Sequence, residues 1–202
     1  MFSVAATPPW SLWDGKDYKN MSDQDEAKFR MIEYHKWKFK AKIFSPLAPL
    51  TVKRTPVLMT RVEYGFLGSY NKYKKSPFET FYMGGDGMSG YSSTYATETI
   101  GLRGYENGSI AGNGGYNSYG YAYSRLSMEL RYPFLLEPSS TIYGLVFVEA
   151  GNAWRDLKDF NPFQLKRSAG VGVRIFLPMI GLMGIDSVSY THLRAHETRH
   201  DL

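Results

Sequence analysis

Polar and apolar residues alternate with a period of two in several parts of this chain. The clearest example is residues 35–44, which read HKWKFKAKIF. The lysines at every second position are Lys36, Lys38, Lys40 and Lys42. Because successive side chains of a strand point to opposite faces, this pattern places the lysines on one face and Trp37, Phe39 and Ile43 on the other. A helix would spread charge and apolar bulk around its circumference, so we predict a strand.

Three other segments alternate in the same way, and residues 141–150 are apolar on both faces apart from Glu149. The alternating segments are 57–70, 123–133 and 166–176. Shorter strands are expected at residues 3–7 and 182–186, which makes about seven strands. Short links that contain proline lie at 45–56, 134–140 and 178–181, and longer polar links lie at 10–33, 71–120 and 152–165. Short turns at one end of a sheet and long loops at the other are typical of a transmembrane β-barrel.

The alternation would also suit a soluble β-sandwich. Two features favour the barrel: the polar faces carry rows of full charges, and the apolar faces carry none apart from Arg167 at the start of its segment. The aromatic residues, 16 Tyr, 12 Phe and 4 Trp, could supply the girdles found at the two lipid boundaries of outer-membrane barrels. No stretch approaches the roughly 20 apolar residues of a membrane helix. We therefore predict an all-β fold that is part of an antiparallel transmembrane β-barrel.

The chain is basic, with a formal net charge of +5 and a pI of about 9.2. Such a charge can indicate a nucleic-acid-binding surface. The lysine row at 36–42, however, shares its strand with an uninterrupted apolar face, and water in a barrel lumen would solvate it. We expect no nucleic-acid partner.

Several segments imitate sites of other kinds. The glycine-rich residues 84–87 and 112–115 resemble phosphate loops, but no helical pattern follows either of them. Residues 22–26 lack the ligand series of a calcium loop, and a short helix with Ser22 as its N-cap explains them better. Because no nucleophile–base pair, acid pair or metal cluster remains, we expect neither an enzyme nor a cofactor.

Five motifs follow one another in an order that points to a known family. They read PFETFYMGG at 77–85, LRGYENG at 102–108, MELRYP at 128–133, FVEAGNAW at 147–154 and RSAGVG at 167–172. Together they resemble the barrel of the BamA family of outer-membrane assembly factors, also called bacterial surface antigens, and their wording is most similar to the Bacteroidetes branch. Leu102 and Tyr105 stand where the family often has Val and Phe, and both changes preserve character.

The resemblance implies that residues 1–186 are the C-terminal part of a barrel of about sixteen strands, with a long loop that folds inward. The loop would start with Phe81, Tyr82, Gly84 and Gly85 and have Arg103, Gly104 and Tyr105 at its tip. We expect Arg103 to reach the inner wall beside Glu149, with Glu129 nearby on the adjacent strand. The resemblance gives no path for the insert at 86–101.

The resemblance also implies a function in the bacterial outer membrane, namely the folding and insertion of nascent β-barrel proteins. The expected partners are these nascent proteins, periplasmic or lipoprotein assembly subunits, and outer-membrane lipid. A related translocation or two-partner secretion pore is an alternative, and a passive porin-like barrel is another.

Both ends of the chain are unusual. The first residues, MFSV, lack the basic region and apolar core of a signal peptide, which fits a piece of an exported protein. Alternation stops at Ile185, and residues 187–202 resemble translated adapter read-through, so we expect a non-native tail without strand pairing after Asp186. The spacing of His192, His196 and His200 would align them on a helix for zinc, but we expect no metal site.

Overall fold

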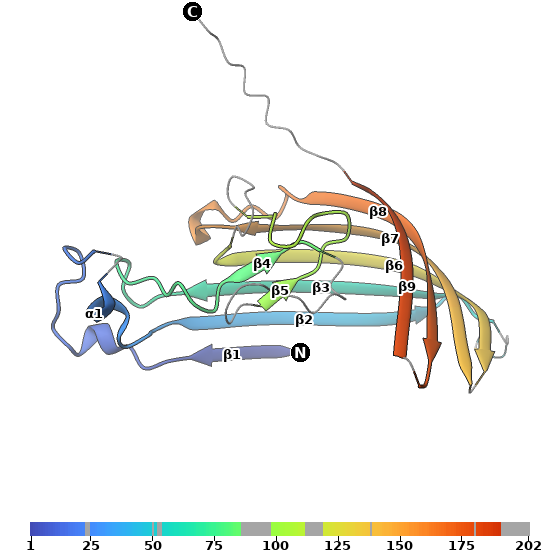
Figure 1. The fold of residues 1–202 in the computed structure, drawn as a ribbon, viewed down its shortest axis with the longest axis horizontal. Helices are drawn as coiled ribbons and strands as arrows, with labels where there is room; N and C mark the ends of the chain where they lie inside the picture. Colours follow the sequence, from blue (N-terminus) through green and yellow to red (C-terminus); the bar gives the residue numbers. More distant parts are fainter. Residues whose placement is uncertain are drawn as a thin grey trace, which may run out of the picture.

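The computed structural model of the chain describes residues 1–22, 25–49, 51, 54–85, 98–111, 119–137, 139–179 and 181–190. Within these residues, seven strands form one antiparallel sheet in the order β1-β2-β3-β6-β7-β8-β9 (Figure 1). Their bounds are β1 Phe2–Ala6, β2 His35–Pro46, β3 Val57–Gly68, β6 Ala122–Glu137, β7 Ser140–Trp154, β8 Lys166–Leu177 and β9 Gly181–Tyr190. A separate parallel pair, β4 and β5, belongs to the long loop and comprises Phe81–Met83 and Glu98–Ile100.

The helical segments are short. They are η1 Trp10–Leu12, α1 Glu26–Phe29 and η2 Leu157–Asp159. Among the described residues, no helix has the length and apolar character needed to cross a membrane. The predicted N-cap Ser22 is wrong, because α1 begins later and its N-cap is Asp25, whose carboxylate accepts a hydrogen bond from the Ala27 N–H at 2.9 Å.

The strands of the large sheet are long, and each pairs with the one before it once the loop strands are set aside. β6 and β7 contain 16 and 15 residues, and β2, β3 and β8 contain 12 each. A tilted transmembrane strand needs about 9–11 residues, so each of these five could cross a bilayer. The prediction of a partial antiparallel barrel is confirmed, and within the described part the sheet stays open between β1 and β9.

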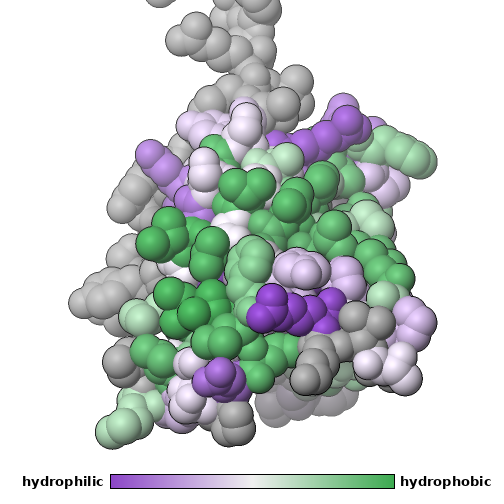
Figure 2. Space-filling model, turned by 90° about the vertical axis from the view of Figure 1, so that its right-hand side faces the viewer, coloured by the Kyte–Doolittle hydropathy of each residue, from purple (hydrophilic) through white to green (hydrophobic). Residues whose placement is uncertain are grey.

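The two faces of the sheet differ as the alternation predicts. Lys36, Lys38 and Lys40 point to the side on which the loop lies, where all three contact Glu98 of β5. The opposite face is apolar and exposed, and its residues include Trp37, Phe39, Ile43, Met128, Val146, Val148, Val171 and Val173. Figure 2 shows apolar side chains gathered on the side of the molecule where β6 to β9 curl. The loop-covered face is therefore the lumen side of the barrel wall.

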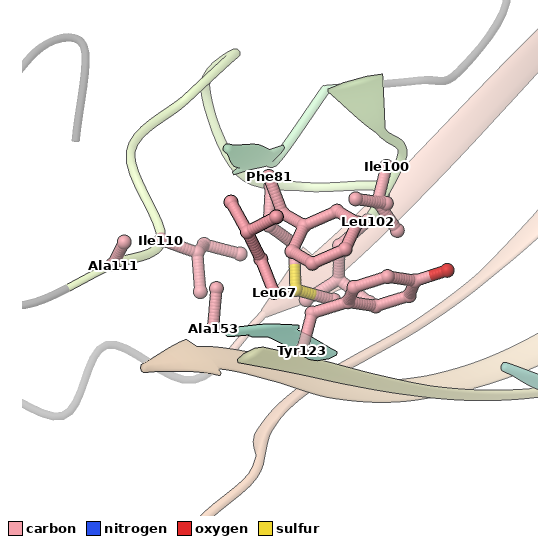
Figure 3. Close-up of a cluster of buried hydrophobic side chains, with 9 residues drawn as sticks. Leu67, Phe81, Ile100, Leu102, Ile110, Ala111, Tyr123 and Ala153 are labelled. Atoms are coloured by element: carbon pink, nitrogen blue, oxygen red, sulfur yellow. The ribbon is translucent and has the colours of Figure 1, made fainter. Parts of the chain in front are cut away.

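The lumen side carries a hydrophobic core that the sequence did not predict. Loop side chains meet wall side chains there (Figure 3). The buried members are Leu67, Phe81, Met83, Ile100, Leu102, Ile110, Ala111, Tyr123 and Ala153. Phe81 packs edge-on against Tyr123 at 4.7 Å between ring centroids. Gly65 makes this possible, because a Cβ there would lie 2.2 Å from the Tyr123 ring. Water alone therefore does not surround the lysine row, and Lys36 is only 4% exposed.

The last strand runs past the predicted boundary. β9 continues to Tyr190, and residues 187–190 pair with 168–171 of β8, so the expectation of no pairing after Asp186 is wrong. Backbone hydrogen bonding to β8 needs no apolar periodicity, and Tyr190 also packs on Tyr105 of the loop tip, with 5.3 Å between ring centroids. Residues 191–202, including the three spaced histidines, lie outside the described residues.

Candidate functional site

The site is the tip of the long loop and the wall that it touches. At the start of the loop, Phe81 lies in the core and the Tyr82 ring lies 6.3 Å from that of Tyr119. Gly84 and Gly85 follow with φ of 129° and 85°, a region that favours glycine. A Cβ on Gly84 would lie 2.0 Å from the carbonyl oxygen of Glu106. The two glycines therefore let the start of the loop run directly against its tip.

The tip is fixed by backbone contacts before its side chains act. The Gly85 N–H donates to the Tyr105 carbonyl oxygen at 2.7 Å. Gly104 has a φ of 91°, which turns the chain tightly after Arg103. The Tyr105 hydroxyl donates to the Arg167 carbonyl oxygen of β8 at 3.0 Å. The tip is thus tied both to the start of the loop and to the wall.

Arg103 binds Glu129 and Glu149, the two acids predicted to lie beside it. Its Nη2 donates to Glu129 Oε1 at 2.6 Å and to Glu149 Oε1 at 2.8 Å. Its backbone N–H also donates to Glu149 Oε2 at 2.9 Å. The guanidinium carbon lies 3.5 Å from the Phe147 ring centroid. Adjacent strands β6 and β7 are therefore joined through one loop side chain.

Neighbouring residues complete the charge pairing of the two acids. Glu149, which is fully buried, also accepts hydrogen bonds from Arg125 Nη2 at 2.9 Å and Ser127 Oγ at 3.1 Å. Glu129 accepts one from Arg131 Nε at 2.9 Å. Buried charges destabilise a protein unless they are paired and hydrogen-bonded, and this network pairs them.

A third acid extends the network to β9. Asp186 forms a two-pronged ion pair with Arg174 of β8, with its Oδ2 at 2.6 Å from Nη2. The same oxygen lies 3.7 Å from Arg103 Nη1. Burial lowers the pKa of the Arg103 guanidinium, but hydrogen bonds and charge from Glu149 and Glu129 outweigh it and raise the pKa above its ordinary value. Arg103 is therefore held as a cation among three carboxylates.

A second loop contact lies on the opposite part of the wall. Glu98 of β5 lies 2.9 Å from Lys38 Nζ, 2.9 Å from Lys40 Nζ and 3.5 Å from Lys36 Nζ. Burial raises the pKa of this carboxyl, but the lysines outweigh burial and lower it to about 2. Neither alternation nor the family resemblance identifies Glu98, because this residue lies in the 86–101 insert, for which the resemblance gives no path. The charge complement of the lysine row was the only available signal.

The described geometry defines a class of protein: an antiparallel barrel wall with a long loop anchored on its inner face. Comparison with known proteins makes the family specific. The Omp85 superfamily domain matches residues 27–188, most of the chain, so the chain belongs to the Omp85 superfamily. This family covers outer-membrane protein insertion and secretion or translocation. A comparison with curated proteins gives no match.

Proposed function

We propose that the chain is the loop-bearing part of a BamA-type assembly factor, which helps nascent β-barrel proteins to fold into the bacterial outer membrane. The observation that carries the proposal is Arg103 bridging Glu129 and Glu149. It ties the loop to two neighbouring strands and stiffens the wall from inside. The partners would be nascent barrel proteins, periplasmic or lipoprotein subunits, and lipid, with no cofactor and no enzymatic step.

The physics of membrane insertion explains why a braced barrel helps. An unpaired backbone polar group in lipid costs several kcal/mol, so a nascent strand needs a partner before it enters the bilayer. A barrel that opens at one seam can offer a strand edge as that partner. The rest of the wall must keep its register while the seam opens, and the anchored loop would provide this rigidity.

The lumen core argues against a passive porin-like barrel. Loop residues such as Phe81, Leu102 and Ile110 are fully buried against this wall, and they occupy space that a water-filled pore would need. A translocation or secretion pore of the same superfamily is the second candidate, because the superfamily covers that activity as well. The two candidates differ in substrate, namely a barrel protein that inserts or a polypeptide that crosses.

The test measures both activities in the complete protein that carries this chain. Proteoliposomes would be given either an unfolded outer-membrane barrel protein or an unfolded secreted polypeptide. We expect Arg103→Ala to slow barrel insertion several-fold, and Arg103→Lys to restore it only in part, because an ammonium lacks the planar fork of a guanidinium. Arg30→Ala, at an exposed arginine after α1, is the matched control. Transport of the secreted polypeptide without barrel insertion, or full activity of Arg103→Ala, would refute the proposal.

A further inference from the structure

Loop segments enclose a cleft at one rim of the sheet, and its volume is about 1090 Å³. Its lining comes from the links between β1 and β2, between β3 and β4, before β6, and between β7 and β8. All of these links lie at the long-loop end of the strands, which in outer-membrane barrels faces the outside of the cell. None of the residues that bind Arg103 lines the cleft, so the cleft is a separate site.

The back of the cleft is held by a buried polar cluster. Tyr18, only 3% exposed, lines the cleft, and its hydroxyl donates a hydrogen bond to Asp14. Lys74 Nζ lies 3.4 Å from that hydroxyl, 4.6 Å from the centroid of the Tyr18 ring and 4.0 Å from Glu33. The cluster joins the first long loop to the segment after β3. The back surface of the cleft is therefore already formed in the absence of a ligand.

The lining combines aromatic rings with charged groups. The rings are Tyr18, Phe29, Tyr73, Phe78, Tyr119 and Tyr121. Cations lie over five of them, and Phe78 is the ring for which no such contact is seen among the described residues. Lys72 Nζ is 4.8 Å from the Tyr73 centroid, Lys75 Nζ is 5.6 Å from that of Tyr121, and the Arg155 guanidinium is 5.5 Å from that of Tyr119. Lys75 also pairs with Asp156 at 3.0 Å. Five basic and four acidic side chains line the cleft, so its charge is nearly balanced.

We propose that this cleft binds an oligosaccharide, neutral or weakly acidic, from the cell surface. A sugar ring has an apolar C–H face, which packs on an aromatic ring, and a hydroxyl edge, which hydrogen-bonds to charged side chains. Tyr73 and Phe78 are 40% and 42% exposed at this rim, and exposed apolar groups bordered by polar ones mark binding sites.

Two other occupants fit the cleft less well. Phosphate-rich polymers bind through a large excess of positive charge, which a nearly balanced lining lacks. An extended peptide adds to a free strand edge, whereas this cleft is walled by loop segments. The chemistry on both counts favours sugar.

The test is a calorimetric titration of the complete barrel protein in detergent. The probes are a lipid-free lipopolysaccharide core oligosaccharide and a neutral dextran oligosaccharide. We expect at least one to bind, and Tyr73→Ala and Phe78→Ala each to weaken it about tenfold. Phe163→Ala, at an 88% exposed ring between β7 and β8 but outside the cleft, should leave the affinity unchanged. Preference for the core oligosaccharide would identify a membrane glycolipid, and preference for dextran would identify a free polysaccharide.

Three results would overturn the proposal: no binding of any probe, equal weakening by Phe163→Ala, or binding of a peptide library in place of the sugars. Barrel insertion is measured on the same variants. We expect insertion to stay at the level of the unmodified protein, since neither Tyr73 nor Phe78 belongs to the ion pairs that Arg103 and Glu98 form with the barrel wall. Failure of sugar binding would thus leave the assembly proposal standing, and failure of assembly would leave sugar binding testable.

Discussion

The loop is anchored to the lumen wall by ion pairs at two places, which differ in composition and in exposure to solvent. At the first, one guanidinium is shared by two carboxylates, and the side chains of Arg103, Glu129 and Glu149 are only 6%, 9% and 0% exposed. At the second, one carboxylate is shared by lysines: the Glu98 side chain is 24% exposed, and those of Lys38 and Lys40 are 29% and 38% exposed. The first anchor is buried, whereas the second is partly exposed at Glu98, Lys38 and Lys40 and buried only at Lys36.

This difference in exposure determines how much stability is lost when one partner of each anchor is removed. Removing one partner from a buried network leaves an uncompensated charge, which costs about 3–5 kcal/mol. A partly exposed ion pair contributes about 0–1 kcal/mol, because water screens it and can replace either partner. The Arg103 anchor should therefore determine whether the loop stays docked, and the Glu98 anchor should adjust how tightly it sits. Four substitutions separate these roles.

The largest effect is expected at Glu149. Glu149→Gln keeps the shape of the side chain but removes the charge that Arg103 and Arg125 share, so we expect a loss of about 3 kcal/mol. The measurement is the midpoint of urea unfolding of the complete protein. Unfolding is monitored by the heat-dependent mobility of the barrel on gels. Glu137→Gln, at the exposed end of β6, is the control and should change little. Equal midpoints for the two variants would show that the buried anchor does not stabilise the barrel.

Gly84 tests the backbone that delivers Arg103 to its acids. A Cβ at this position meets the Glu106 backbone, so Gly84→Ala should cost about 2 kcal/mol beyond the strain of a positive φ alone. Gly181→Ala is the control for the strain of a large positive φ, because Gly181 has a φ of 96° and a Cβ added there would meet no atom within 4 Å. Protease nicking of the loop is the readout. Similar nicking of both variants would mean that the contact between the start and the tip of the loop is unimportant.

The sequence predicted the wall better than what covers it. Alternation located the strands and their faces, because the pleat ties side-chain direction to sequence parity. Resemblance to a family located Arg103 and its acids. Parity could not show that Tyr123 and Leu67, on the charged face, would be buried by a loop, nor that Glu98 would cross the lumen to the lysines. Both depend on the path of the insert, which local sequence does not determine.

Glu98→Gln should reduce the free energy of docking the loop on the wall by about 1 kcal/mol. It should also remove the pH dependence of that docking. The carboxyl has its pKa lowered from 4.5 to about 2 in the folded protein, so its contribution is present above pH 4.5 and is lost as the pH falls toward 2. As the pH falls through this range, the mobility of a spin label on the loop should rise in the unmodified protein. It should rise less in the Glu98→Gln variant. Identical acid profiles for the two proteins would exclude Glu98 as the titrating group.

The smallest effect is expected at Lys38. Lys38→Met keeps most of the length of the side chain and removes one of three cations near Glu98, whose other partners Lys36 and Lys40 remain within 3.5 Å. We expect the free energy of docking the loop to fall by less than about 0.5 kcal/mol. A partly exposed ion pair contributes little to stability, and the two neighbouring lysines still pair with Glu98. The same spin-label assay would report it, with Lys36→Met as the comparison. Because Lys36 is buried and also pairs with Glu79 at 3.1 Å, its loss should release the loop more than that of Lys38. If Lys38→Met instead matched Lys36→Met, exposure would not distinguish the lysines, and the second anchor would act as one unit like the first.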